Sequence, residues 1–479
     1  MCCIVAASGG MMEDTAPVPR KGEGRRPLVA SASYVFWVMF CISFLNYLDR
    51  YVLSGAGNVM AKELKFDLGQ LGLIGSAFLI VYTLCSMPLG MLGDRLKRKN
   101  VVATCVAIWS CATALTALAN NFLSLFLFRM LLGVGEAGYF PAGTALLSDY
   151  FSRSRRSRIM SFWSIGQYVG VLGGYALGGY LATLYFGSWR LAFLLTGIPG
   201  LLLALLIWLA REPRRNQADE EEQQQRGAVS EPVELTNAPR GTILQQCLSL
   251  LKIKTMITLT VMQIFAYFVL GIAAYYLPVF LQQKDTFDLS SDRAGLYSGG
   301  VIVIASLIGT LTGGYLSDLL NRRHPGARVL VCGLGFLLCA PVFATAILTR
   351  DMTLFTLFFV LTAILLTLYT GPSTAAIQDV VPSYLRSSAV AVSMLVAHLL
   401  GDAFAPPLVG MLATSFDPTH GTHFQANMAG NELALAFLYT CVPALVLAGL
   451  VGIFGARWMK DDVAAAEQAD REARIVPAS

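Results

Sequence analysis

Five ionisable residues stand inside long apolar stretches of this chain: Asp49, Arg50, Arg129, Glu136 and Asp402. If those stretches cross a bilayer, each charge costs at least about 2.5–3.5 kcal/mol, even on the lenient insertion scale. Charges that persist at such a cost usually face the inside of a helix bundle and belong to a binding site or an ion pathway. These five residues are therefore the first candidates for chemistry.

Asp49 is the candidate for reversible proton binding. It is next to Arg50 and three residues after Asn46, and this spacing places Asn46 and Asp49 on one helix face. Burial and a neighbouring guanidinium shift the pKa of a carboxyl group in opposite directions, so a moving neighbour can change its protonation. The alternative is a fixed ion pair with Arg50 or Arg129 that only joins two helices.

Arg129 and Glu136 form a second constellation. Seven residues is almost two helical turns, so both side chains project from one face about 10 Å apart. Arg129 can bind a phosphate or carboxylate through two parallel hydrogen bonds. Glu136 is either a second proton carrier or the counter-ion of Arg50. The alternative for the whole group is a polar core that neutralises itself.

His398 and Asp402 are spaced i and i+4, so they share a helix face and can form a proton relay or gate. A hydrogen-bonded packing pair is the alternative. No metal site is expected here, because no third ligand is at hand. We expect aromatic residues of the seventh apolar stretch to form a cavity wall suited to an amphiphile: Tyr267, Phe268, Tyr275 and Tyr276.

Composition places these residues in a membrane protein. Hydrophobic residues make up 55% of the 479 residues and charged residues only 14%, against about 25% charged in soluble proteins. The apolar residues form blocks of about twenty, the length of a helix that crosses a bilayer. We predict an all-α protein with twelve spans near 34–55, 70–91, 101–119, 122–146, 159–184, 190–209, 254–281, 294–317, 328–348, 353–376, 387–413 and 434–456.

The distribution of Lys and Arg predicts the orientation. With both termini on one side, that side receives 27 of the 35 basic residues, and the opposite loops receive six. By the positive-inside rule both termini are cytoplasmic. Anionic lipid headgroups and this topology account for the net charge of +5, so no nucleic-acid partner is expected.

An acidic, Gln-rich stretch divides the chain into two sets of six spans. It is too polar to fold alone and is typical of a disordered linker. We predict five segments: a disordered cytoplasmic N-terminus (1–33), an N-terminal six-helix bundle (34–209), a cytoplasmic linker (210–250), a C-terminal six-helix bundle (251–458) and a cytoplasmic tail (459–479).

Short motifs repeat at matching places in the two halves. The second span is followed by Gly90-x-x-Gly93-Asp94-Arg95-x-x-Arg98-Lys99, and the eighth by Gly313-Gly314-x-x-x-Asp318-x-x-x-Arg322-Arg323. An Asp and, seven residues later, an Arg follow the fourth and tenth spans. We expect these loops to control gating, although they could equally be topology signals: Asp94, Arg95, Arg98, Lys99, Asp149, Arg156, Asp318, Arg322, Asp379 and Arg386.

The Gly90–Lys99 loop resembles the signature loop of the major facilitator superfamily. Arg129-x-x-x-Gly133-x-Gly135-Glu136 is similar to the fourth-helix motif of that superfamily. The glycines of the fifth span resemble its fifth-helix motif without the usual proline: Gly166, Gly170, Gly173, Gly174, Gly178 and Gly179. The resemblance implies two six-helix bundles over about residues 34–460.

A narrower resemblance is to spinster-like lysolipid transporters. It is carried by four motifs: Asn46-Tyr47-Leu48-Asp49-Arg50, Gly93-Asp94-Arg95-Leu96-Lys97-Arg98-Lys99, Gly133-Val134-Gly135-Glu136-Ala137, and His398-Leu399-Leu400-Gly401-Asp402-Ala403. The last is the most specific. The family implies proton coupling through Asp49, with a proton gradient as the energy source and no cofactor.

We therefore expect proton-coupled transport of a lysophospholipid or sphingosine-1-phosphate-like lipid by alternating access. Symport of a small organic anion, such as a hexuronate, is the alternative. No nucleotide-binding loop, nucleophile motif or zinc spacing indicates an enzyme, and a scaffold or sensor is a remaining alternative. We expect a monomer that contacts membrane lipids. Its membrane is a bacterial inner membrane, a plasma membrane or a lysosomal membrane.

Overall fold

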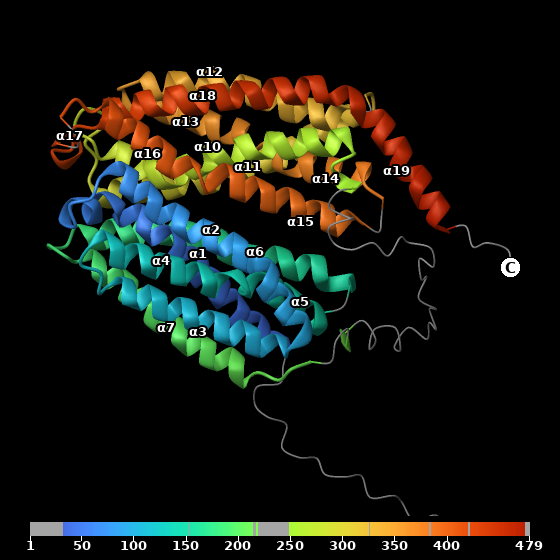
Figure 1. The fold of residues 1–479 in the computed structure, drawn as a ribbon, viewed down its shortest axis with the longest axis horizontal. Helices are drawn as coiled ribbons and strands as arrows, with labels where there is room; N and C mark the ends of the chain where they lie inside the picture. The colour runs from blue at the N-terminus through green and yellow to red at the C-terminus, as the bar shows by residue number, and fades with distance from the viewer. Residues whose placement is uncertain are drawn as a thin grey trace, which may run out of the picture.

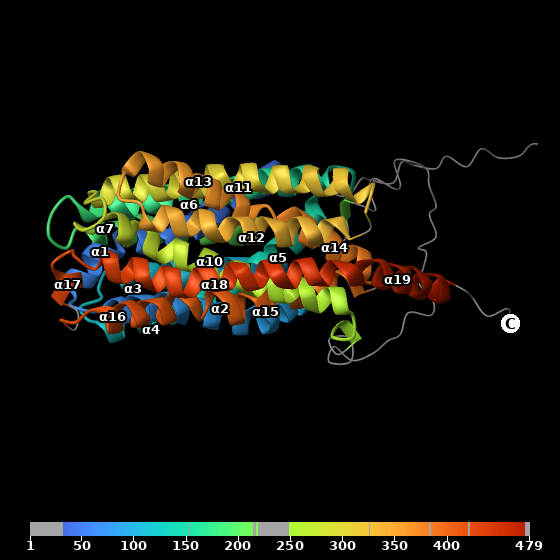
Figure 2. The same ribbon diagram turned by 90° about the horizontal axis from the view of Figure 1, so that it is seen from above.

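The computed structural model describes residues 32–151, 153–213, 217–218, 249–324, 326–382, 385–419 and 422–474. Long helices run along one axis and form two bundles, one from each half of the chain (Figure 1). Seen from above, the helices are nearly parallel, and α19 (Met459–Arg474) extends beyond the bundles (Figure 2). The predicted all-helical fold is confirmed in these ranges.

The N-terminal bundle contains the following helices: α1 (Ala32–Glu63), α2 (Leu68–Arg95), α3 (Arg98–Thr116), α4 (Phe122–Ala137), α5 (Tyr139–Tyr150), α6 (Arg153–Ala182) and α7 (Trp189–Leu209). The C-terminal bundle contains the following: α10 (Lys254–Leu281), α11 (Ser291–Asn321), α12 (Ala327–Leu348), α13 (Met352–Thr367), α14 (Thr370–Val380), α15 (Arg386–Ala397), the π-helix η2 (His398–Asp402), α16 (Ala405–Phe416), α17 (Thr422–Gln425) and α18 (Gly430–Gly455).

Eleven helical segments in the described ranges are long and apolar enough to cross a membrane. Three of them combine two helices, namely α4 with α5, α13 with α14, and α15 with α16, and a fourth runs from α18 through η3 (Ala456–Trp458) into α19. Helix α6 completes the predicted twelve, and its glycines and polar residues keep it below the hydropathy of the other spans. Each predicted span coincides with a helix, although α1 continues to Glu63, past its predicted end at residue 55.

The C-terminal segment is more ordered than a simple tail. After α18 the chain turns through η3 (Ala456–Trp458) into α19. In α19, Asp462 accepts a hydrogen bond of 2.7 Å from the backbone N–H of Thr255, in the first turn of α10. A carboxylate there satisfies an otherwise unpaired helix N–H, so α19 is attached to the C-terminal bundle.

The two bundles meet tightly at one end, which we call the sealed end; it carries α17. There Tyr276 donates a hydrogen bond of 2.6 Å to the carbonyl of Leu68, and Tyr175 donates one of 2.6 Å to the carbonyl of Ala274. Asn58 donates to Gln282 at 3.1 Å. Each of these bonds joins the N-terminal bundle to the C-terminal one.

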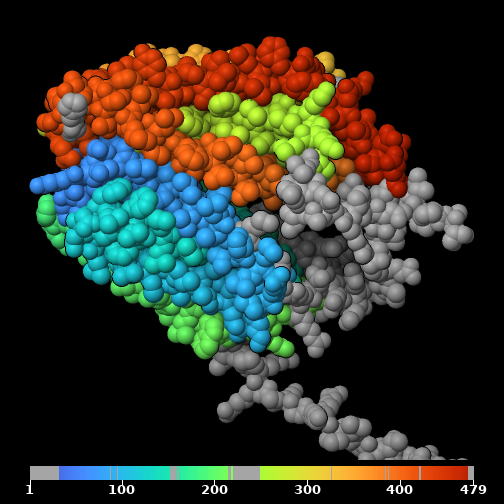
Figure 3. Space-filling model, in the orientation of Figure 1, coloured from blue at the N-terminus to red at the C-terminus, as the bar shows by residue number. Residues whose placement is uncertain are grey.

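At the other end, which carries α5, α14 and α19 and which we call the open end, α2 and α15 diverge (Figure 1). Leu71 in the first part of α2 is buried, whereas Leu84 farther along is 62% exposed. On α15, Met394 and Leu395 are also exposed. The space-filling view shows the two bundles in contact toward α17 and separating toward α19 (Figure 3).

Close packing at the sealed end depends on glycine at residue 295. A Cβ atom there would lie 2.3 Å from the carbonyl oxygen of Tyr175, whereas a Cβ atom at Gly300, on the same helix, would meet nothing within 4 Å. Overpacking of this kind costs about 1–3 kcal/mol. We expect Gly295→Ala to lower the thermal unfolding midpoint in detergent and Gly300→Ala to leave it unchanged. Equal midpoints for the two variants would contradict this account of the seal.

Candidate functional site

An ion pair between α1 and α4 lies at the centre of the N-terminal bundle. Arg50 Nη2 lies 2.8 Å from Glu136 Oε2. The Glu136 side chain is fully buried, whereas that of Arg50 is 18% exposed. The Arg50 guanidinium also lies over the rings of Tyr47, Phe78 and Tyr82, at 4.9–5.2 Å from their centroids. In this conformation Glu136 is thus the counter-ion of Arg50, and part of the Arg50 side chain remains exposed.

Asp49 is buried but has a different kind of partner. Its Oδ2 accepts a hydrogen bond of 3.3 Å from Thr113 on α3, and Thr196 on α7 is a second hydroxyl neighbour. Among the described residues no basic side chain forms an ion pair with it, so neither Arg50 nor Arg129 is its fixed partner. A hydroxyl can donate to a carboxylate or accept from a carboxylic acid. Asp49 therefore keeps a hydrogen bond in both protonation states.

Arg129 is a buried guanidinium without a counter-ion at ion-pair distance in the described part of the chain. Only 3% of the residue is exposed, and its Nε and Nη2 atoms make no hydrogen bond. The guanidinium lies 5.4 Å from the ring centroid of Phe193. Asp49, Glu136 and Tyr275 lie within electrostatic range. Arg129 can therefore accept an anionic ligand without first breaking an ion pair.

In the C-terminal bundle, His398 and Asp402 are joined across one turn of π-helix. His398 Nδ1 lies 2.9 Å from Asp402 Oδ2, and the ring of Tyr267 meets the imidazole edge-on at 4.5 Å. Gly401 allows this turn to approach α10, because a Cβ atom would lie 2.7 Å from the carbonyl oxygen of Ile264. Isolated π-turns are often found at functional sites. The i, i+4 spacing indicates the shared face but not the π-turn.

The predicted cavity-wall residues occupy different places. Tyr267 contacts His398, and Phe268 packs beside Gly401, where η2 approaches α10. Tyr275 packs against Gly75 on α2, across the boundary between the bundles. Tyr276 is fully buried and donates to carbonyls at the sealed end. Tyr276 therefore belongs to the contacts of the sealed end rather than to the predicted cavity wall, because its hydroxyl donates to Leu68 of the other bundle.

Matching Arg–Asp ion pairs lie at the open end, one inside each bundle. Arg98, in the first turn of α3, pairs with Asp149 at the end of α5. Arg328, in the first turn of α12, pairs with Asp379 at the end of α14 and lies 3.2 Å from Asp318. Both Arg–Asp pairs are 51 residues apart in sequence. Arg328 was not among the predicted site residues, although this equal spacing is a sequence signal that indicates it.

The other predicted loop residues make separate contacts. Lys99 donates to the carbonyl of Ala210 at 2.6 Å, and Arg386 donates to that of Gln378 at 3.0 Å. Arg95 and Arg322 are exposed. The side chains of Asp94 and Arg156 lie outside the described set. Glu212, which the sequence analysis did not select, accepts hydrogen bonds from the N–H groups of Arg98 and Lys99.

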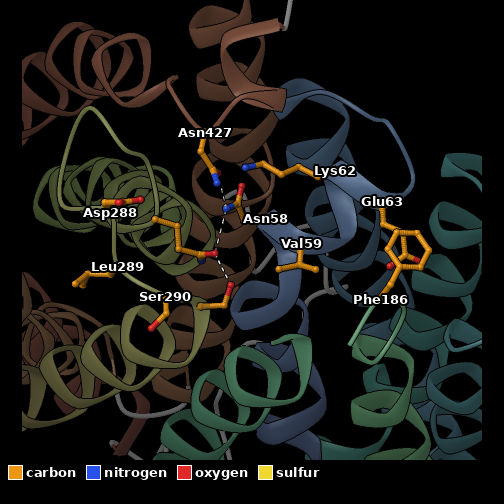
Figure 4. Close-up of a pocket in the computed structure, with 11 residues that line it drawn as sticks. Asn58, Val59, Lys62, Glu63, Phe186, Asp288, Leu289, Ser290 and Asn427 are labelled. Atoms are coloured by element: carbon orange, nitrogen blue, oxygen red, sulfur yellow. Dashed lines mark hydrogen bonds between the residues drawn. The ribbon is translucent and has the colours of Figure 1, made fainter. Parts of the chain in front are cut away.

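A pocket of about 540 Å³ lies at the sealed end, between the two bundles (Figure 4). Asn58 donates there to Asn427 at 3.2 Å, as well as to Gln282. Lys62 reaches the same region, and its buried Nζ makes no hydrogen bond in the described structure. This pocket has no signal in the sequence, because it is formed by residues more than 350 positions apart.

The two open-end ion pairs differ in burial, which predicts a graded effect on stability. The side chain of Asp149 is 2% exposed and that of Asp379 is 37% exposed. Removing one partner of a buried pair costs about 3–5 kcal/mol, and less where water replaces it. We expect Arg98→Ala to lower the unfolding midpoint more than Arg328→Ala does. The exposed Arg322→Ala is the control and should match wild type; an equal loss in all three would refute the assignment.

Comparison with known proteins agrees with this architecture. Residues 39–406 match the Major Facilitator Superfamily. The chain is 29% identical to spinster homologue 1 of Xenopus laevis over 83% of this chain and 76% of that protein. It is 25% identical to a sphingosine-1-phosphate transporter of Danio rerio over 94% of this chain and 88% of that protein.

A crystal structure of a bacterial homologue of the human lysosomal transporter spinster, in an inward-facing and unoccupied conformation, has the same fold. It is 24% identical, covers 90% of this chain and 98% of its own, and superposes with a TM-score of 0.78. The fold and the relatives are those of membrane transporters and not of enzymes. The chain belongs to the major facilitator superfamily and is a spinster-like, multi-pass membrane transporter.

Proposed function

We propose that this protein couples proton movement to the transport of an anionic lysolipid. The observation that carries the proposal is Arg129, a buried cation with no ion-pair partner in the described structure, close to a buried acid that is also free of an ion pair. An anionic headgroup that neutralises Arg129 changes the electrostatic potential at Asp49. Binding of the anion and the protonation of Asp49 are thereby linked.

Two features favour a lipid over a small polar solute. The guanidinium of Arg50 is surrounded by the rings of Tyr47, Phe78 and Tyr82. Near the open end, Met91 and Leu92 of α2 help to line an apolar hollow of about 290 Å³, with Arg95 beside them. A basic group next to apolar surface suits an amphiphile with an anionic head. The similarity to a sphingosine-1-phosphate transporter supports the same substrate class.

The mechanism that fits this arrangement is alternating access. The bundles touch at one end and are separated at the other, and each is held internally by its own Arg–Asp pair. Rocking one bundle against the other would break the contacts of the sealed end and close the open end. A proton gradient supplies the energy in this scheme, and no cofactor takes part. We place both termini on the cytoplasmic side and expect the monomer, surrounded by membrane lipids, to be the working unit.

Asp49→Asn tests proton coupling. The amide cannot exchange a proton but keeps the size and the hydrogen bond to Thr113. In proteoliposomes we expect pH-driven lysolipid transport to fall to background, while lysolipid binding persists. Asp461→Asn, an exposed change in α19, is the control and should transport normally. Undiminished pH-driven transport by Asp49→Asn would remove this residue from the mechanism.

Arg129 variants test headgroup recognition. Loss of a charged hydrogen bond costs about 1.5–3 kcal/mol, which corresponds to about 10- to 150-fold in Kd. We expect Arg129→Ala to weaken lysolipid binding by that factor and Arg129→Lys, which keeps the charge, to weaken it less. Arg457→Ala, at an exposed site, is the control.

Competition against organic acids then distinguishes the two substrate classes. Displacement of bound lysolipid by excess lysolipid but not by hexuronate supports the proposal. Tight hexuronate binding that depends on Arg129, with no lysolipid binding, would instead favour symport of a small organic anion.

A further inference from the structure

Three potential metal ligands converge beyond the membrane-spanning part of the C-terminal bundle, at the sealed end. Asp417 follows α16, His423 lies on α17 and Glu432 lies in the first turn of α18. Their ligand atoms all lie within 4.8 Å of one another. None of the three belongs to the group of buried charges around Asp49 and Arg129 or to the sequence motifs described above.

The distances match a small tetrahedral ion. His423 Nδ1 lies 2.9 Å from Glu432 Oε1 and 3.6 Å from Asp417 Oδ1. Zinc binds imidazole nitrogen and carboxylate oxygen at about 2.0–2.2 Å, and these bond lengths place neighbouring ligand atoms about 3.4 Å apart. Small side-chain movements would therefore bring all three groups to bonding distance, with a fourth position left for water.

One further observation points to a ligand, and a second shows how Asp417 is held. Glu432 is only 8% exposed, and its Oε2 atom is buried without a hydrogen-bond partner in the described structure. Asp417 Oδ1 is fixed by the N–H of Thr419 at 2.8 Å and by its hydroxyl at 2.5 Å. These two bonds hold the Asp417 side chain in place beside His423. A buried carboxylate oxygen without a partner is costly unless a proton or a cation reaches it.

We propose that Asp417, His423 and Glu432 form a binding site for a divalent transition metal ion of the zinc class. Two carboxylates and one imidazole are ligands that zinc accepts, whereas magnesium and calcium prefer oxygen ligands alone. The cation would neutralise the two carboxylates and join α16, α17 and α18. The site is independent of the substrate and of the proton-coupling scheme.

The metal site has a direct connection to the seal. Phe424, next to His423, is buried, and its ring lies 5.7 Å from Lys62 Nζ on α1. Asn427, between His423 and Glu432 in sequence, accepts the hydrogen bond from Asn58 across the two bundles. Fixing α17 against α16 and α18 therefore stabilises the contacts that close this end, so bound metal should favour the sealed conformation.

The three ligands lie in an electronegative environment. The hydrogen bond to Glu432, together with the charges of Asp417 and Asp285, raises the pKa of the His423 imidazole. Among the basic groups near the three ligands, Lys62 lies beside Phe424, and Arg350 donates a hydrogen bond of 2.8 Å to Asn431 Oδ1, next to Glu432.

Zinc titration of the purified full-length chain in detergent tests the proposal, by calorimetry at pH 8 and by the shift in unfolding midpoint. We expect one Zn²⁺ per chain and a higher midpoint with Zn²⁺, because a ligand that binds the folded state stabilises it. His423→Ala and the isosteric Glu432→Gln should each weaken Zn²⁺ binding by about tenfold or more and remove the midpoint shift.

His324→Ala, which removes an exposed histidine at the open end, is the matched control and should bind Zn²⁺ as wild type does. Failure of the wild-type protein to bind Zn²⁺ would overturn the proposal. So would unchanged binding in both His423→Ala and Glu432→Gln, since the ion would then be held elsewhere. Because binding and unfolding are measured without substrate, a failure here is distinguishable from a failure of the transport proposal.

Discussion

Buried charges that must find partners across helix boundaries govern the architecture of this transporter. A guanidinium or carboxylate in an apolar bundle loses its hydration, and only a close opposite charge or hydrogen bond restores the loss. Arg50 and Glu136 join α1 to α4, whereas Arg98 and Asp149 join α3 to α5. These pairs hold neighbouring helices together. Asp49 and Arg129 differ from them, because both are buried and neither forms an ion pair in the described part of the chain.

The two bundles have the same Arg–Asp ion pair at the open end, but their interiors contain different residues. Arg328 and Asp379 repeat the Arg98–Asp149 arrangement at the same sequence separation. The N-terminal bundle, however, contains the central charges, while the C-terminal bundle contributes tyrosines and the single His398–Asp402 turn. Such a division lets one bundle hold an ionised headgroup and the other offer apolar contacts, as an amphiphilic substrate requires.

Contact between the bundles is a matter of close backbone approach rather than of charge. Gly295 permits contact with Tyr175, and the tyrosine hydroxyls at this end donate to backbone carbonyls across the boundary. Hydrogen bonds between uncharged groups, and glycine contacts, can be broken and remade without moving an unpaired charge through the membrane. A seal of this kind is suited to a protein whose bundles must separate repeatedly.

The sequence by itself determined the spans, the two-bundle repeat and the set of central charges. Hydropathy and helical spacing are local properties, so the shared faces of Asn46 with Asp49 and of His398 with Asp402 could be read directly from the chain. The family motifs added the fold and the expected chemistry. Hydropathy did not determine the helix ends, because helices such as α1 continue beyond the apolar stretch.

Only the tertiary structure decided which groups are partners. Glu136 pairs with Arg50, whereas Asp49 accepts a hydrogen bond from Thr113. Arg129 has no counter-ion in the described part of the chain. Tyr276, which was predicted to line the cavity, instead donates a hydrogen bond across the sealed end. The tertiary structure also brought Asp417, His423 and Glu432 together, although no metal spacing marks them in the sequence. The physical reason is that electrostatic and hydrogen-bonding partners are chosen by distance in space, which helix packing sets and sequence separation does not.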